Sequence, residues 1–468
     1  MKTKKIYSIF VLYGMITACA CSVQKYNSPG MAGYKTVFRD SINGDTAKNS
    51  AAIAWKDFYD DPHLQKLITE ALDSNLNIRM AIIKLRQAEQ AVKQSNAAFL
   101  PTLNAGLSGT LSDNSKYGNA MPAAHPPFTD LKLSLSSSWE IDVWNKLSSA
   151  KKAQQALYFQ QQSTVNAVRT QIVANVASVY YQLVTLDKQR EITHRSIDSY
   201  TKYLETVKSL KKSAQVTEVA VLQAKAQLAT AKAYLPQIEA SIANYENYLC
   251  ALLGKAPASI DRSSRIDLTA FHPEAPSVGL PVQLLSNRPD VQAAELSLRA
   301  AHEQFNVARS AMYPQFILSG AIGPDAKGID NWFNLPGSLF WNAVAGLMQP
   351  VLNGRTLKTQ KEVARLQKES ALLNFKQSLL TAGNEVSNAL ASIRFSSQQA
   401  VFQKEQVDAL KKAYEYSQEL LVNGYATYLE VLSAQNSVLS SELALYNTYN
   451  TIVQQKITLY RALGGGWR

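Results

Sequence analysis

The chain has 468 residues, enough for two or three ordinary domains, yet no linker rich in proline, glycine and serine divides it. Its net charge of +12 is spread along predicted helical stretches without a nucleic-acid motif, which indicates solvated helix faces and no nucleic-acid partner. The sequence contains no Walker loop, GxSxG elbow or HExxH motif, and its five histidines are scattered. We therefore predict neither an enzyme nor a cofactor or metal site.

The N-terminus is typical of an exported lipoprotein. Lysines at positions 2, 4 and 5 precede twelve apolar residues, a run that fits a signal peptide and is too short to span a bilayer. Residues 16–19, Ile-Thr-Ala-Cys, resemble a lipobox, and Cys21 is the competing position. We predict a signal peptide over 1–18, lipid attachment at Cys19 or Cys21, and a lipid-anchored segment over 19–60. The alternative is an ordinary cleavage site in which the cysteines are incidental.

The two halves of the chain resemble each other. Residues 72–101 match 285–314 at a shift of 213, and residues 219–254 match 429–464 at a shift of 210. Two such copies imply a duplication, and we predict repeats over 61–270 and 271–468. Each repeat is expected to contain a helix, a β-hairpin, a very long helix and a second long helix.

The first helix of each repeat is predicted over 62–99 or 280–313, because a proline follows and disfavours helix before it. Alternation of apolar and polar residues then predicts hairpins over 102–141 and 315–349, with loops at 113–127 and 323–338. Strands of about ten residues with one apolar face suit a transmembrane β-barrel. A hairpin of a soluble sandwich gives a similar pattern.

Stretches without proline over 143–212 and 352–423 predict two very long helices, each followed after a turn by a second long helix. The long helices are therefore expected over 142–254 in the first repeat and 352–464 in the second. Before its turn, each stretch has some 70 residues, or about 105 Å of helix at ~1.5 Å per residue. Such rods need neighbours, as coiled coils do, and a soluble coiled coil is the alternative. Cys250, in an apolar helical run, is expected to be a buried, inert thiol.

Several chains are needed to close a barrel from this sequence. Four strands in lipid would leave unpaired backbone N–H and C=O groups at both sheet edges, and each unpaired group costs on the order of a few kcal/mol. Three chains would supply twelve strands, which lies within the range of known membrane barrels. The predicted fold class is therefore mainly α with a transmembrane β-barrel, in a trimer that forms a 12-strand β-barrel and a long periplasmic α-helical barrel.

Four short segments carry a family resemblance: 55–64 near the start, Asn-Arg-Pro-Asp-Val at 287–291, Tyr-Leu-Glu-Val-Leu at 428–432, and the ending at 462–467. In this order, with the duplication and the lipobox, they resemble the TolC-type outer-membrane efflux factors. The likeness is greatest to the lipoprotein branch associated with resistance-nodulation-division (RND) pumps, and it spans nearly the whole mature chain. It implies a homotrimer that is lipid-anchored in the outer membrane and extends into the periplasm.

The resemblance also implies a function and sites. The chain would be a passive exit duct, supplied by an inner-membrane transporter of the RND type through a periplasmic adaptor (membrane fusion) protein. Family members constrict the tip just after the second helical turn, where Glu430 falls, and Ser433 stands where the family can carry a second acid. Gly424 keeps the family's turn glycine, whereas the first copy has Ala214. The adaptor is expected to dock on the two turns, at Ser213, Glu218, Gly424 and Tyr425.

Several of these residues also have a purely structural interpretation. Glu430 can be an ordinary exposed helix carboxylate. Asp290 at a helix start favours the helix dipole, and Arg288 can pair with it. The alternative function is a soluble periplasmic scaffold built from coiled coil.

Overall fold

The structure is a computed structural model, and it describes residues 23–29, 53–112, 128–262, 287–327 and 329–467. The predicted signal peptide and both candidate lipid-attachment residues, Cys19 and Cys21, lie outside the described residues. The chain divides into two compact units. Unit 1 comprises Met1–Pro29, Leu85–Gln161 and Ala294–Phe375, and unit 2 comprises Gly30–Lys84, Gln162–Ala293 and Lys376–Arg468.

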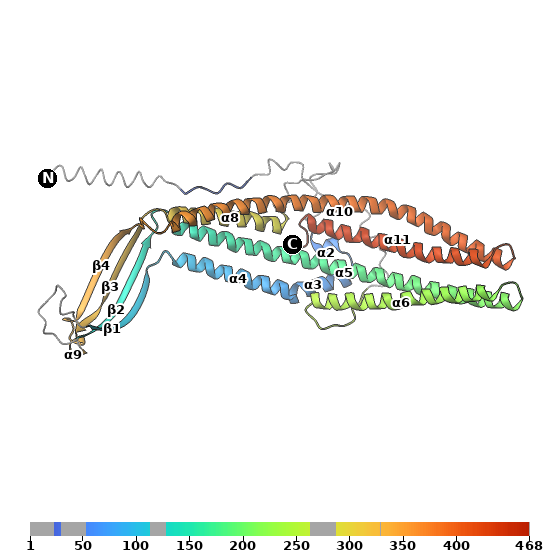
Figure 1. Cartoon of the computed structure of the whole chain (residues 1–468), viewed down its shortest axis with the longest axis horizontal. Helices are drawn as coiled ribbons and strands as arrows, with labels where there is room; N and C mark the ends of the chain where they lie inside the picture. Colours follow the sequence, from blue (N-terminus) through green and yellow to red (C-terminus); the bar gives the residue numbers. More distant parts are fainter. Residues whose placement is uncertain (1–22, 30–52, 113–127, 263–286, 328, 468) are drawn as a thin grey trace. The chain divides into compact units, whose positions relative to one another are not determined.

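An order of helix, two strands and two long helices occurs twice along the chain, with α2 and the α3–α4 break described only in the first run and the short α9 only in the second (Figure 1). Its first run is α2 (Trp55–Phe58), α3 (Pro62–Ser74), α4 (Leu76–Ala97), β1 (Thr102–Ser112), β2 (Phe128–Ile141), α5 (Lys146–Lys212) and α6 (Glu218–Leu252). Its second run is α8 (Pro289–Ser310), β3 (Gln315–Lys327), α9 (Ile329–Trp332), β4 (Leu339–Met348), α10 (Thr356–Val422) and α11 (Tyr428–Ala462). Both α5 and α10 have 67 residues, about 100 Å of helix each. The repeat boundaries proposed above stay a prediction.

The first helix is broken, and the prediction of one continuous helix over 62–99 is wrong in this respect. Asn75 has an extended backbone between α3 and α4. Its side-chain oxygen accepts from the backbone N–H of Asn77 (2.9 Å) and Ile78 (3.2 Å), which starts α4. Its amide nitrogen donates to the carbonyl of Leu252 at 2.7 Å. Because asparagine competes for backbone hydrogen bonds in this way, it ends one helix and begins the next.

The four strands form one antiparallel sheet in the order β1-β2-β3-β4, which leaves β1 and β4 at its edges. The predicted loop at 323–338 begins too early, since β3 continues to Lys327. A Cβ built on Gly323 would lie 1.9 Å from the carbonyl oxygen of Leu133 in β2. This glycine therefore permits a close approach of two strands and does not mark a turn.

One face of the sheet is apolar across all four strands. Residues directly opposite each other point to the same face. Leu107 lies opposite Leu133, and Trp341 lies opposite Ile322. The other face is mostly small and polar on β1 and β2, whereas β4 also presents Phe340, Val344 and Met348 there. An ion pair of Lys132 with Asp325 (3.1 Å) joins β2 to β3 on this face.

The main core of unit 2 contains the segment around α2 and α3. Phe58 stacks on Tyr460 of α11 with ring centroids 4.0 Å apart. Asp61 caps α3 by accepting from the backbone N–H of His63 at 2.8 Å, and Pro62 occupies the first turn. Cys250 is buried in α6, as predicted, whereas its inertness stays a prediction. Among the described helices, none combines the length and the apolar composition that a bilayer span requires.

Candidate functional site

The turn between α5 and α6 ends a helix without glycine. Ala214 has φ of 57°, in the left-handed region. Its N–H donates to the carbonyl of Lys211 (2.9 Å), and the N–H of Gln215 donates to that of Leu210 (3.0 Å), the pair of bonds of a Schellman cap. The carboxylate of Glu218 pairs with Lys211 across the turn. Ser213 is exposed and donates its hydroxyl to the carbonyl of Ser209 at 3.3 Å.

The turn between α10 and α11 has the same geometry with glycine in place. Gly424 has φ of 76°, and its N–H donates to the carbonyl of Leu421 at 3.1 Å. The N–H of Tyr425 donates to the carbonyl of Leu420 at 2.8 Å, which completes the second Schellman cap. Tyr425 is 83% exposed, so this turn presents an aromatic ring to its surroundings.

Glu430 forms a capping box at the start of α11. Its carboxylate accepts from the backbone N–H of Thr427 (2.8 Å), while the Thr427 hydroxyl accepts from the N–H of Glu430 (3.4 Å). Glu430 remains exposed, so one carboxylate both ends the turn and faces solvent. Ser433, one turn further, is also exposed. The equivalent Thr217 makes no side-chain cap, and Ala220 stands where Glu430 would.

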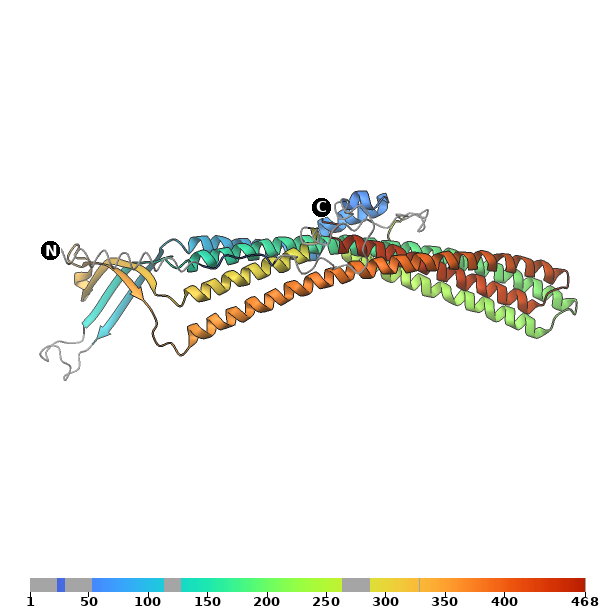
Figure 2. The ribbon, with the colours of Figure 1, turned by 90° about the horizontal axis from the view of Figure 1, so that it is seen from above.

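The two turns lie at the same end of the helices of unit 2 (Figures 1 and 2). The four expected docking residues and both expected gate residues are therefore brought to one region, which we call the tip: residues 209–222 and 420–433. A hydrophobic core lies beneath it, to which both helical hairpins contribute.

Two tyrosines of this core, which sequence reasoning missed, join the two hairpins. Tyr203 donates its hydroxyl to the carbonyl of Tyr428 (2.6 Å), and Tyr200 donates to the side-chain oxygen of Asn436 (2.5 Å). Burial raises the pKa of Tyr200 to about 12 and raises that of Tyr203 above its usual range. Both therefore remain neutral donors at physiological pH. Their spacing of three places them on one helix face, a signal that was available in the sequence.

A buried acid lies behind the tip. Glu442 of α11 is 8% exposed and pairs with Lys411 of α10 at 2.7 Å and with Arg195 of α5 at 3.9 Å. Its charge is compensated from two other helices, as a buried charge requires.

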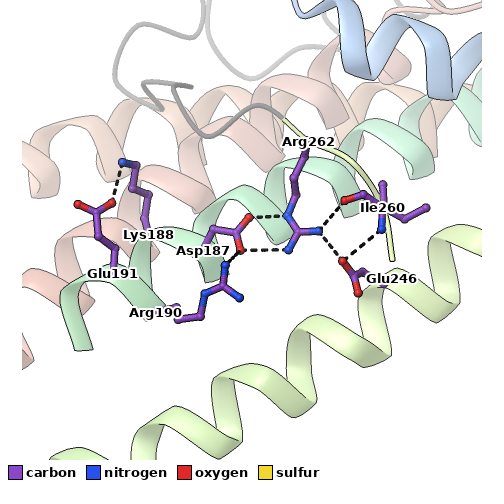
Figure 3. Close-up of polar contacts among 7 residues, drawn as sticks. All are labelled: Asp187, Lys188, Arg190, Glu191, Glu246, Ile260 and Arg262. Atoms are coloured by element: carbon purple, nitrogen blue, oxygen red, sulfur yellow. Dashed lines mark hydrogen bonds and ion pairs between the residues drawn. The ribbon is translucent and has the colours of Figure 1, made fainter. Parts of the chain in front are cut away.

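A second charged cluster fastens the chain segment that follows α6 (Figure 3). Arg262 donates to Asp187 of α5, with one contact of 3.0 Å, and to Glu246 of α6 at 2.5 Å. Arg190 reaches the same Asp187 at 3.0 Å. Burial alone would lower the pKa of Arg262, but the hydrogen bonds to the two carboxylates raise it above its usual range. The cluster joins α5, α6 and the segment around Ile260 by charge-assisted bonds.

The predicted pairing near the start of α8 is present. Arg288 donates to the carboxylate of Asp290 at 2.6 and 3.0 Å, to Glu385 of α10 at 2.9 Å, and to the carbonyl of Ala462 at 3.0 Å. Burial opposes ionisation of Asp290, but the hydrogen bonds and charge of Arg288 lower its pKa below the usual value. This arginine therefore ties the start of α8 to the middle of α10 and to the C-terminal end of α11.

The apolar face of the sheet is uncovered in the single chain. Leu107 is 70% exposed and Trp341 is 75% exposed. Leu103, Leu111 and Leu347 are also exposed on this face. An uncovered apolar face of this extent marks a surface that meets lipid or another protein. Within the described ranges, no group of three His, Cys, Asp or Glu residues could hold a metal ion.

Comparisons with known proteins agree over nearly the whole chain. A family model described as outer membrane efflux protein matches residues 67–255 and 280–465. The probable outer membrane lipoprotein SilC of Salmonella typhimurium is 28% identical over 470 residues, covering 100% of this chain and 99% of SilC. The structure of the outer-membrane channel OprN is similar with a TM-score of 0.85 and 24% identity, and that of CusC with 0.82 and 25%. Each covers 95% of this chain and 99% of the other. The predicted mainly helical fold class is confirmed by these structures.

Proposed function

This chain belongs to the outer membrane efflux protein family, and from that premise we propose that it is the exit duct of a tripartite efflux system in the outer membrane. An inner-membrane transporter of the RND type would supply the driving force, and a periplasmic adaptor would connect the two. The chain itself would do no catalysis. The family match, which extends over both halves of the chain, is the observation that carries this function. It favours the duct over the soluble scaffold.

The sheet supports a trimeric barrel. Its apolar face suits lipid, and the outer sides of the edge strands β1 and β4 pair with no further strand among the described residues. Unpaired edge groups in lipid cost about several kcal/mol each, so other copies must pair with them. Three copies would close twelve strands, within the range of known barrels. SilC is named a lipoprotein, and attachment of lipid at Cys19 or Cys21 would add an anchor to this barrel.

The helices of unit 2 also favour assembly with further copies. Phe395, Val401 and Phe402 are exposed on α10 in the single chain. Neighbouring copies packed side by side would bury these side chains, as partner helices do in coiled coils. The same threefold symmetry would then build the barrel and a helical tube.

Gate and docking roles are assigned to the tip. In a trimer, three copies of Glu430 would surround the axis with Ser433 one turn away, and three carboxylates would attract cations and repel each other. Docking of the adaptor is assigned to Ser213, Glu218, Gly424 and Tyr425. The exposed ring of Tyr425 is the kind of aromatic anchor that protein interfaces favour.

Cross-linking in cells tests the docking assignment. A photo-reactive residue at Ser213 should capture an adaptor, and Tyr425→Ala or Glu218→Lys should reduce both the capture and the efflux of dyes at least threefold. Glu415→Lys is the matched control, since Glu415 is exposed on α10 outside the tip. Capture and efflux unchanged in both tip variants would contradict the assignment.

A further inference from the structure

A short N-terminal segment, residues 23–29, lies along α8 in unit 1 (Figure 1). The carbonyl oxygen of Gln24 accepts from His302 Nε2 at 2.7 Å and from Asn306 Nδ2 at 3.2 Å. A carbonyl can only accept, so His302 carries a proton on Nε2. Four residues later, the hydroxyl of Ser28 donates to the carboxylate of Glu295.

The α8 side of this contact is built into the fold. His302 is 4% exposed and Asn306 is 1% exposed. Buried polar groups need hydrogen-bond partners, and the Gln24 carbonyl serves both of these side chains. The ring of Tyr26 meets that of His302 edge-on, with centroids 5.7 Å apart. Burial, helped by the charge of Glu295, raises the pKa of Tyr26 to about 12, so its hydroxyl stays neutral.

The two ends of the contact fix the direction of the segment. Along α8, Glu295 precedes His302 and Asn306, whereas in the segment Gln24 precedes Ser28, so the two run antiparallel. Four extended residues span about 13–14 Å, and the helix rises about 10–16 Å between the two contact points. The lengths agree. The chain therefore reaches Gln24 from the C-terminal end of α8, the end that leads into β3.

We propose that residues 23–29 are a strap, docked on a seat formed by Glu295, His302 and Asn306, that holds the N-terminal lipid anchor close to the base of the sheet. The presence of lipid rests on the function proposed above. Gln24 follows Cys21 by three residues and Cys19 by five, so the chain that joins the acylated residue to the seat can extend to at most about 10 or 17 Å.

The docked strap would restrict where the lipid anchor enters the membrane, which a flexible tether would not do. A single acylated residue seldom holds a protein in a membrane. A docked strap makes the tether short, so the acyl chains enter the bilayer beside the sheet of their own chain.

Trypsin tests the strap on the full-length protein in isolated outer membranes, labelled in the cell with radioactive palmitate. Lys25 is exposed, and cleavage after it would release the acylated end from the body. A docked segment must detach before a protease can cleave it, so cleavage reports docking. The release is followed by the label and by mass spectrometry of the new N-terminus at Tyr26.

The double variant His302→Ala/Asn306→Ala should be cleaved after Lys25 at least tenfold faster than the wild type. Ser28→Ala, which leaves α8 itself intact, should also be cleaved faster. Gln24→Ala should retain protection, because its contact uses the backbone. His194→Ala/Asn96→Ala is the matched control, since both residues are exposed on helices away from the strap.

Equal cleavage rates in the wild type, the double variant and Ser28→Ala would overturn the strap. If these variants lose protection but neither they nor the wild type carries palmitate, the seat is supported and the lipid anchor is contradicted. The two parts of the proposal therefore fail separately.

Discussion

Replacing Glu430 in two ways separates its charge from its capping contact. Glu430→Gln removes the charge but keeps an oxygen that can accept from the N–H of Thr427, and glutamine is an accepted partner in a capping box. Glu430→Ala removes both. Thr427→Ala removes the hydroxyl half of the box and leaves the carboxylate.

The expected size of the capping effect follows from the two hydrogen bonds. The contact to the N–H of Thr427 is 2.8 Å, whereas the reverse contact is long at 3.4 Å. Loss of a cap costs about 1 kcal/mol, which corresponds to a roughly fivefold change in a local opening equilibrium. Hydrogen exchange at the Thr427 amide should therefore rise about fivefold in Glu430→Ala and less than twofold in Glu430→Gln.

Conductance in planar bilayers then tests the gate. If the three carboxylates constrict the tip, Glu430→Gln should change the open probability and its dependence on divalent cations as strongly as Glu430→Ala does. Thr427→Ala, which keeps the charge, should behave like the wild type. The gate would be refuted if the Glu430→Gln channel conducted like the wild type while the conductance of the Thr427→Ala channel changed. Glu430 would then be a helix cap only.

Three further predictions concern the turn, the sheet and an ion pair. Ala214→Gly should slow hydrogen exchange at this turn about fivefold, because a left-handed alanine costs about 1 kcal/mol that glycine avoids; unchanged or faster exchange would contradict this. Leu107→Arg should lower the amount of assembled protein in the outer membrane, since a cation in mid-bilayer costs about 2–4 kcal/mol. Ser108→Arg, one residue on and on the opposite face, should assemble normally, and equal loss in both would argue against a lipid-facing surface. Because Arg288 lowers the pKa of Asp290, the pair stabilises the fold above the unfolded pKa of about 3.9 and loses this contribution as pH falls through the folded value. The Asp290→Asn variant should thus unfold at a lower temperature than the wild type at pH 7, and the difference should shrink as the pH falls below about 3.9. A difference that stays constant would contradict the linkage.

Patterns that repeat along the chain could be predicted well from the sequence. The alternation at 102–141 gives the first hairpin because β1 and β2 have one mainly apolar and one mainly polar face. The absence of proline and the regular apolar spacing give α5 and α10 to within a few residues of their ends. Cys250 lies in the core as its apolar neighbours indicate.

Features that depend on distant partners could not be predicted. Asn75 breaks a helix through a carbonyl 177 positions away, which no local pattern records. Gly323 suggested a loop, because close approach of two strands and a turn both call for glycine. The partners of Arg262 come from two helices 75 and 16 positions away.

The tip contains both features that could be predicted from the sequence and a feature that depends on the structure. Gly424 could be recognised as a helix end, because a left-handed residue there favours glycine. The capping box was also readable, since threonine followed by glutamate three residues on is its signature. Its consequence, that one carboxylate is shared between a cap and a proposed gate, needs the structure.

The native mass of the protein, extracted by detergent from isolated outer membranes, tests the trimeric duct most directly. A particle of about three times the 51.6 kDa of one chain, less the leaders, is the expected result. A monomer or dimer in the soluble periplasmic fraction would contradict the barrel and, with it, the duct.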